Sequence, residues 1–366
     1  MSIKLSSKHL AMSLVALAAA AVGAQAQAQT VPSSSVTIYG VVDAYGQYLK
    51  GNDSLARVQS GGLNGSRFGL RGSEDLGGGL RGIFTLESGI NLDDGTNGQN
   101  AFWGRQAFVG IVSPYGTVTA GRQYGSLYAL SGDFSEFTNG PAGASTAVIG
   151  GFGSYEPVRG GSTTATLNGG PSRVNNAVKY ETPSFSGLKA GALVGLGEVS
   201  GNTRGTRQVD VYARYTQGPI DAMLSAVDDN SSANGLAVRT FSGAAAYSFG
   251  DARAMAGVIS VNDRTRINAD GTGYWVGGDY RIGLNLLRLQ YVQNKAKNVA
   301  AGKTQAIGAG YQYDLSKRTA LYSSLTYFKN EGAGYRDRIA TAIPAGLTTA
   351  SDRNVTEFVA GVRHAF

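Results

Sequence analysis

Apolar and polar residues alternate with a period of two, in pieces of about ten residues, over most of the chain from Val36 to Phe366. The first piece, VTIYGVVDAYGQY, sets Val36 and Ile38 on one face and Asp43 and Gln47 on the other. A strand of this kind has one apolar and one polar face, as in a barrel wall that separates lipid from water. The alternation therefore predicts an all-β protein.

The same pattern predicts about sixteen strands, an even number, as single-chain bacterial barrels have. The expected strands cover residues 36–48, 64–74, 79–90, 101–113, 115–123, 172–182, 187–199, 206–217, 219–229, 237–249, 251–262, 272–282, 284–295, 303–314, 318–329 and 353–366. Short turns alternate with long polar connections, of which 124–171 is the longest. Membrane barrels have this asymmetry between periplasmic turns and outer loops. We therefore expect a transmembrane antiparallel β-barrel.

A closed sheet also follows from what the chain lacks. After the N-terminal segment, no uninterrupted apolar run reaches the roughly 18 residues of a helical span. In hydrocarbon every backbone N–H and C=O must be paired internally, so only a closed sheet remains. Aromatic residues near strand ends are expected to form the interfacial girdles: Tyr48, Trp103, Tyr215, Trp275, Tyr291 and Tyr327.

Residues 1–28 have the features of a secretory signal peptide. Lys4 and Lys8 precede an apolar run over 10–22, and two A-x-A cleavage patterns follow at 24–26 and 26–28. An N-terminal membrane helix is the alternative, but the run is shorter than the roughly 20 residues that a span needs. We expect residues 29–366 to be exported as one barrel domain, which disfavours a nucleic-acid partner.

Composition argues against an enzyme or a metal centre. The chain has no cysteine, and its two histidines are His9, within the expected signal peptide, and His364. His364 shares the parity of Phe358 and Phe366, so it is expected to face away from the lumen and cannot serve a nucleophile there. We expect no catalytic residue, no metal ligand set and no cofactor.

Two motifs have simpler interpretations than ligand binding. Residues 77–82 match G-x-G-x-x-G, but a charged turn precedes them and a strand follows, so they are expected to form a hairpin turn. The acidic pairs at 93–94 and 228–229 are consistent with solvated loop charge or with a divalent cation at the mouth.

Several ordered blocks resemble one family. SSVTIYGVVDAYGQY, SRFGLRGSEDLGGGLRGIFTLESG, FWGRQAFVGI, YGTVTAGRQYG, SRVNNAVKYETPSFSGLKAG and the C-terminal GVRHAF are similar to the general diffusion porins of Gram-negative outer membranes, in the β-proteobacterial branch. The resemblance implies a homotrimer of 16-stranded barrels surrounded by outer-membrane lipid and lipopolysaccharide. It also implies that the third loop, here about 124–171, folds inward and narrows the pore.

The resemblance also assigns the pore constriction. Asp133 and Glu136 match the acidic positions of the inward loop, and Arg67, Arg105 and Arg173 match the basic cluster on the wall. Opposite charges across a narrow water path produce a transverse field that separates cations from anions.

The expected function is passive diffusion of ions and small hydrophilic solutes through a water-filled pore. The chain carries +7, and loss of Lys4 and Lys8 with the signal peptide leaves 7 − 2 = +5, which favours weak anion preference. A solute-specific outer-membrane channel is the alternative.

Overall fold

The structure is a computed structural model that describes residues 34–137, 173–198, 200–201, 207–230, 238–264, 271–297, 303–331 and 354–366. The signal peptide expected at 1–28 and residues 138–171 of the expected third loop lie outside these ranges. Within them, no helix is long and apolar enough to cross a membrane.

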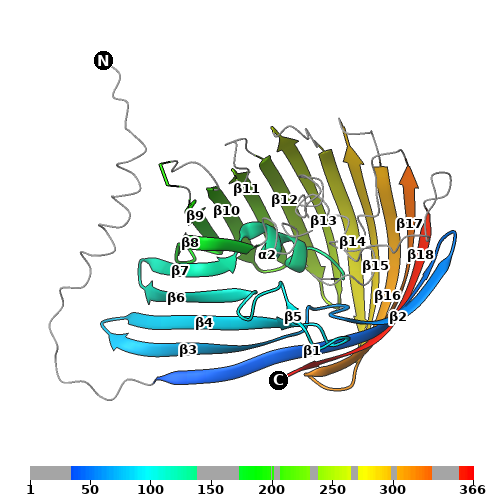
Figure 1. The fold of residues 1–366 in the computed structure, drawn as a ribbon, viewed down its shortest axis with the longest axis horizontal. Helices are drawn as coiled ribbons and strands as arrows, with labels where there is room; N and C mark the ends of the chain where they lie inside the picture. The colour runs from blue at the N-terminus through cyan, green and yellow to red at the C-terminus, as the bar shows by residue number, and fades with distance from the viewer. Residues whose placement is uncertain are drawn as a thin grey trace.

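One antiparallel sheet of eighteen strand segments makes up the wall (Figure 1). The strands are β1 (Ser35–Lys50), β2 (Ser54–Ser60), β3 (Arg67–Gly77), β4 (Leu80–Ile90), β5 (Asn97–Gly98), β6 (Gln106–Ser113), β7 (Gly116–Tyr124), β8 (Arg173–Glu181), β9 (Leu188–Gly195), β10 (Gln208–Gln217), β11 (Ile220–Asp229), β12 (Val238–Phe249), β13 (Ala252–Asp263), β14 (Gly271–Ile282), β15 (Asn285–Ala296), β16 (Lys303–Asp314), β17 (Thr319–Glu331) and β18 (Val355–Ala365). A single helix, α2 (Ser126–Asp133), follows β7 among the described residues.

These segments occupy sixteen positions around the wall. β2 and β3 both pair with β1, and β5 and β6 both pair with β4, so each pair fills one position, which gives 18 − 2 = 16. β18 pairs with β1 and closes the ring. Closure pairs the edges that an open sheet would expose. The predicted sixteen-stranded antiparallel barrel is confirmed.

The predicted strand boundaries are wrong at two places, where an insertion divides a wall position into two strand segments. β2 lies within 49–63, which was expected to be a loop, and β6 begins at Gln106 rather than near 101. In both places one wall position is divided by an insertion, so the alternation that marks a strand is interrupted. The expected strand 64–74 is likewise only one part of a divided position.

Side-chain direction follows the predicted alternation. Along β1, Val36 and Ile38 face outward, whereas Asp43 and Gln47 are buried in the interior. Trp275 is an exception to the expected girdles: its indole is fully buried and faces the lumen, because its parity on β14 matches the inner face. Tyr48, Tyr215 and Tyr327 do face outward.

The hairpin between β3 and β4 explains the glycine motif. Gly77, Gly78 and Gly79 have φ values of 79°, 60° and 80°, in the region that favours glycine. A turn of this kind joins two strands and leaves no helix N-terminus for a dinucleotide. The sequence interpretation of 77–82 as a turn is confirmed.

Candidate functional site

The segment after β7 enters the barrel as α2, and its first turn is held by the wall. Asp210, almost fully buried on β10, accepts hydrogen bonds from the backbone N–H of Ser126 at 2.6 Å and from its hydroxyl. A carboxylate at a helix N-terminus pairs with an orphan N–H and with the positive end of the helix dipole. Leu127 and Leu130 lie in the interior hydrophobic cluster with Met223 of β11. The start of the inward segment is therefore anchored by both charge and apolar contact.

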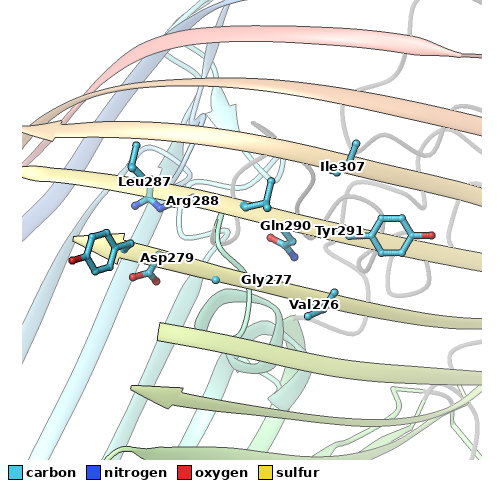
Figure 2. Close-up of a pocket in the computed structure, with 11 residues that line it drawn as sticks. Val276, Gly277, Asp279, Leu287, Arg288, Gln290, Tyr291 and Ile307 are labelled. Atoms are coloured by element: carbon cyan, nitrogen blue, oxygen red, sulfur yellow. The ribbon is translucent and has the colours of Figure 1, made fainter. Parts of the chain in front are cut away.

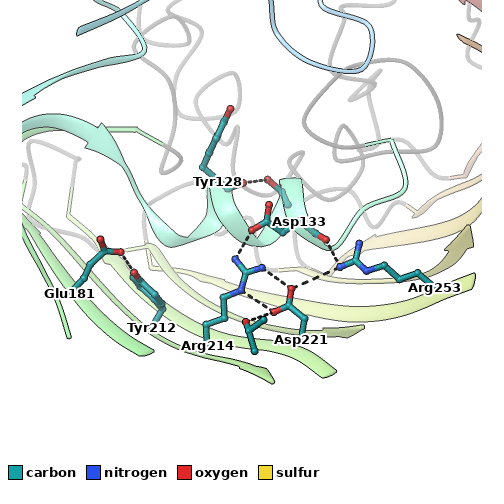
Figure 3. A network of polar contacts seen from close by, with 9 residues as sticks. Tyr128, Asp133, Glu181, Tyr212, Arg214, Asp221 and Arg253 are labelled. Carbon is teal, nitrogen blue, oxygen red and sulfur yellow. Dashed lines mark hydrogen bonds and ion pairs between the residues drawn. The ribbon is translucent and has the colours of Figure 1, made fainter. Parts of the chain in front are cut away.

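The end of α2 meets a charged network on the wall (Figure 3). Arg214 of β10 contacts Asp133 at 2.5 Å and also binds Asp221 through two hydrogen bonds of 2.9 and 2.7 Å. Arg253 of β13 donates to the Asp133 carbonyl oxygen at 2.9 Å. Cationic groups at a helix C-terminus satisfy the last carbonyls and the negative end of the dipole.

The residues just past α2 lie flat against β14, β15 and β16. The indole Nε1 of Trp275 donates to the Phe134 carbonyl at 2.6 Å, and Gln290 accepts from the Ser135 hydroxyl and from the Glu136 amide at 3.1 and 3.0 Å. Glycines on the wall make room for the next two side chains. A Cβ on Gly277 would lie 2.8 Å from Glu136, and one on Gly310 would lie 2.6 Å from Phe137.

Glu136 is therefore at the contact between loop and wall. It is 3% exposed. Burial, together with the neighbouring Asp279 carboxyl, raises the pKa of Glu136 to about 8, although Arg288 and Arg253 oppose this. At neutral pH the group is mostly uncharged. The sequence predicts Glu136 among the acidic groups opposite Arg67, Arg105 and Arg173, and the structure places it against Gln290 and Gly277 of the wall.

The basic cluster is organised around one carboxylate, Glu87 of β4. Arg105 binds it at 2.9 Å and is itself buried, and Arg67 lies 3.6 Å away. The phenols of Tyr39 and Tyr124 donate to the same carboxylate at 2.9 and 2.6 Å. Two of the three predicted arginines are thus brought together by a shared counter-ion.

Arg173 joins the cluster through aromatic rings. Its guanidinium lies 5.2 Å from the ring centre of Tyr124 and 5.4 Å from that of Tyr128, and these rings stack 3.7 Å apart. Arg105 donates to the Tyr128 hydroxyl at 2.9 Å. Cation–π contact holds a guanidinium in place without neutralising it. All three predicted arginines therefore lie around Tyr124 and Tyr128.

Sequence reasoning missed several members of this site. Tyr124 ends β7 and Tyr128 lies on α2, so no single strand or helix period places the two rings together. Arg214 lies on the inward parity of β10, as Asp210 does, but nothing local showed that it pairs with Asp133. Arg122 of β7 donates to the Gly104 carbonyl at 2.7 Å.

A hollow of about 470 Å³ lies over β14 and β15 (Figure 2). Exposed side chains of the outer face, among them Val276, Tyr280, Leu287 and Ile307, line most of it, and Asp279, Arg288 and Gln290 also border it. This hollow lies on the outer face of the wall, so it is not the solute path. His364 also faces outward, as predicted, and hydrogen-bonds Thr319.

Comparison with known proteins agrees with this geometry. A family model described as "Gram-negative porin" matches residues 13–333. Outer membrane porin protein 32 of Delftia acidovorans is 32% identical, with 97% of this chain and 99% of that protein covered. An outer membrane porin protein of Bordetella pertussis is 30% identical over 88% of this chain and 94% of its own length.

Solved structures give the same fold. An anion-selective porin from Comamonas acidovorans has a TM-score of 0.75 and 28% identity, with 91% of this chain and all of that chain (100%) covered. A trimer form of OmpT from Vibrio cholerae, 17% identical over 91% of this chain and 99% of that one, has a TM-score of 0.64. A closed barrel with apolar outer and polar inner faces, together with these matches, shows that the chain belongs to the Gram-negative porin family, as a passive diffusion channel of the outer membrane.

Proposed function

We propose that this porin passes ions and small hydrophilic solutes with a weak preference for anions, and that Arg67, Arg105 and Arg173 set that preference. The observation that carries the proposal is the charge balance of the cluster: Arg67 and Arg105 share one carboxylate, Glu87, and the third guanidinium, that of Arg173, lies against the rings of Tyr124 and Tyr128. The anion-selective porin named above adds support from a similar fold.

In this proposal the acidic residues of the constriction contribute little to the electric field across the pore. Asp133 is half-exposed but paired with Arg214, and Glu136 is buried and mostly neutral. The positive side therefore dominates the field across the narrowed path, and an anion is stabilised there relative to a cation. α2 and the residues after it narrow the lumen, and solute size is limited by that narrowing.

Planar-bilayer recording tests this proposal. Reversal potentials in a KCl gradient should show anion preference for the wild type, and Arg67→Gln, Arg105→Gln and Arg173→Gln should each shift it towards cations. Unchanged selectivity in all three variants would remove the arginines from the constriction. A conductance that saturates with one solute class would favour the solute-specific channel instead.

We also propose that the mature chain begins after residue 28 and assembles as a homotrimer in contact with lipid and lipopolysaccharide. The trimer form of a similarly folded porin supports the assembly. Single-channel records that close in three equal steps would support it, and single closures from a monodisperse monomer would contradict it. N-terminal sequencing of the exported protein reads the cleavage site directly.

A further inference from the structure

The wall is interrupted beside the arginine cluster by a turn that projects into the barrel. Ala44 pairs with Ser60 on β2, and Val41 pairs with Arg67 on β3. Two residues of β1 therefore lie opposite the six residues Gly61–Ser66, which we name the inward turn. A β-bulge adds an unpaired residue and can re-aim a side chain beside a functional site. This insertion is larger than an ordinary bulge.

The inward turn packs against the lumen side of the wall. Gly62 lies under Tyr322 and Tyr45, which leave no room for a Cβ there, and Leu63 is buried in the same apolar cluster. Tyr45 and Tyr322 have the inward parity of β1 and β17. The turn is therefore inside the barrel.

Asp43 holds nearly the whole turn. Its carboxylate, 0% exposed, accepts the backbone N–H groups of Gly62, Leu63 and Asn64 at 3.1, 3.0 and 2.9 Å. It also accepts the Tyr322 hydroxyl at 2.5 Å. A carboxylate that receives several N–H donors is a strong, geometrically specific acceptor.

The backbone of Asp43 is engaged as well. The Ser66 hydroxyl donates to the Asp43 carbonyl at 3.0 Å and accepts from the Asp43 amide at 3.0 Å. The Gly61 amide donates to the same carbonyl at 2.6 Å. Both ends of the turn are thereby fixed to one residue of β1.

The far side of the turn meets the arginines. Arg67 Nη1 donates to the Gly65 carbonyl at 3.0 Å. A Cβ on Gly65 would lie 2.9 Å from Arg105 Nη1, so the glycine leaves the space that this guanidinium occupies beside the turn. The Ser66 carbonyl accepts from the Ile90 amide at 2.9 Å, which ties the turn to β4, the strand of Glu87.

We infer that Asp43 is a positioning residue for ion selectivity, acting through the inward turn to hold Arg67 and Arg105 at the constriction. This inference rests on the proposed anion-selective pore. It makes the inward turn a second element of the constriction, on the side of the barrel that carries the basic cluster.

The test uses the sign of the selectivity change in Asp43→Asn. Loss of a negative charge near the pore would by itself increase anion preference. Release of the inward turn would instead decrease anion preference. The carboxamide of asparagine places an N–H₂ donor against the N–H groups of the turn, so the turn is no longer held and no longer positions the arginines. We expect Asp43→Asn to lose anion preference and to gain single-channel conductance.

Ser66→Ala is the second variant, since it removes two contacts to Asp43 and leaves every charge in place. It should reduce anion preference in the same direction, and it keeps the inference testable if Asp43→Asn does not fold. Glu357→Gln is the matched control: Glu357 is another fully buried carboxylate, on β18, and it accepts from Gln47. We expect the control to keep its anion preference or to increase it slightly, and not to lose it.

Unchanged or increased anion preference in folded Ser66→Ala and Asp43→Asn would overturn the inference. So would an equal loss of preference in Glu357→Gln. Failure of the proposed function is distinct, because the wild type would then lack anion preference, or Arg67→Gln and Arg105→Gln would leave it unchanged.

Discussion

At the scale of single residues, buried carboxylates hold other groups of the barrel interior in position. Glu87, Asp210 and Asp43 are nearly inaccessible, and each one receives several donors. A buried carboxylate is tolerated only when it is well paired. Their function in this barrel is to hold arginines, a helix N-terminus and a turn in defined positions.

Replacing Glu87 should lower the free energy of unfolding substantially. Glu87→Gln leaves the buried Arg105 without its ion pair, and loss of one partner of such a pair costs about 3 kcal/mol or more of unfolding free energy. Urea unfolding of the refolded barrel measures this. Asp228→Asn is the matched control, because Asp228 and its partner Arg239 are both partly exposed, and it should cost about 1 kcal/mol or less. Equal costs would show that Arg105 is not held by Glu87.

The raised pKa of Glu136 predicts a dependence of stability on pH. From the ordinary value of 4.5 up to about 8, the unfolded chain has lost this proton while the folded protein keeps it. The folded state then binds more protons, so the contribution of Glu136 to stability falls as pH rises through this window and reaches its minimum above about 8.

Glu136→Gln isolates that contribution, because glutamine is neutral throughout. Unfolding free energies measured from pH 4 to 9 should show that the variant becomes more stable relative to the wild type as pH rises. A difference that does not change with pH would place Glu136 in contact with water instead.

At the scale of elements, α2 and the residues after it act as one docked unit. Contacts to β10, β13, β14 and β15 secure its start, its end and its continuation. The hydrophobic cluster beneath α2 stabilises the docked unit, but apolar contacts are not directional. The hydrogen bonds have a defined geometry and therefore set the position of α2.

The bond from Trp275 to the Phe134 carbonyl offers a test of this docking. Trp275→Phe keeps an aromatic ring but leaves the buried carbonyl without this donor, at a cost of about 1–3 kcal/mol. We expect noisier open-channel current and faster proteolysis near residue 134. Trp103→Phe, whose ring packs against Phe68 and Phe102, is the control and should behave as wild type. Quiet current in Trp275→Phe would show that other contacts suffice.

At the scale of the whole molecule, the barrel separates two solvents. Leu325 lies midway along β17 on the outer face, and Leu321 lies nearer the strand end on the same face. Leu325→Arg should destabilise the barrel in lipid vesicles by about 2–4 kcal/mol, and Leu321→Arg by about 1 kcal/mol or less, since the cost depends on depth. Equal effects in a urea titration would mean that this face does not span the hydrocarbon.

The sequence by itself determined the barrel, the direction of most wall side chains and the turns, because a period of two is a local property that lipid and water enforce at every strand. It did not show the division of one wall position into β2 and β3, since the inward turn breaks the alternation. The resemblance predicted the three arginines, but it did not identify Glu87 as the carboxylate that Arg67 and Arg105 share.

Only the tertiary structure decided where the charges of the loop act. Asp133 and Glu136 look alike in sequence, yet Asp133 meets Arg214 from β10 and Glu136 enters a space left by Gly277 on β14. Those partners lie 81 and 141 residues further along the chain. Whether a carboxyl is paired, neutral or facing the pore depends on such distant neighbours, because its charge is set by the desolvation and ion pairs that folding creates.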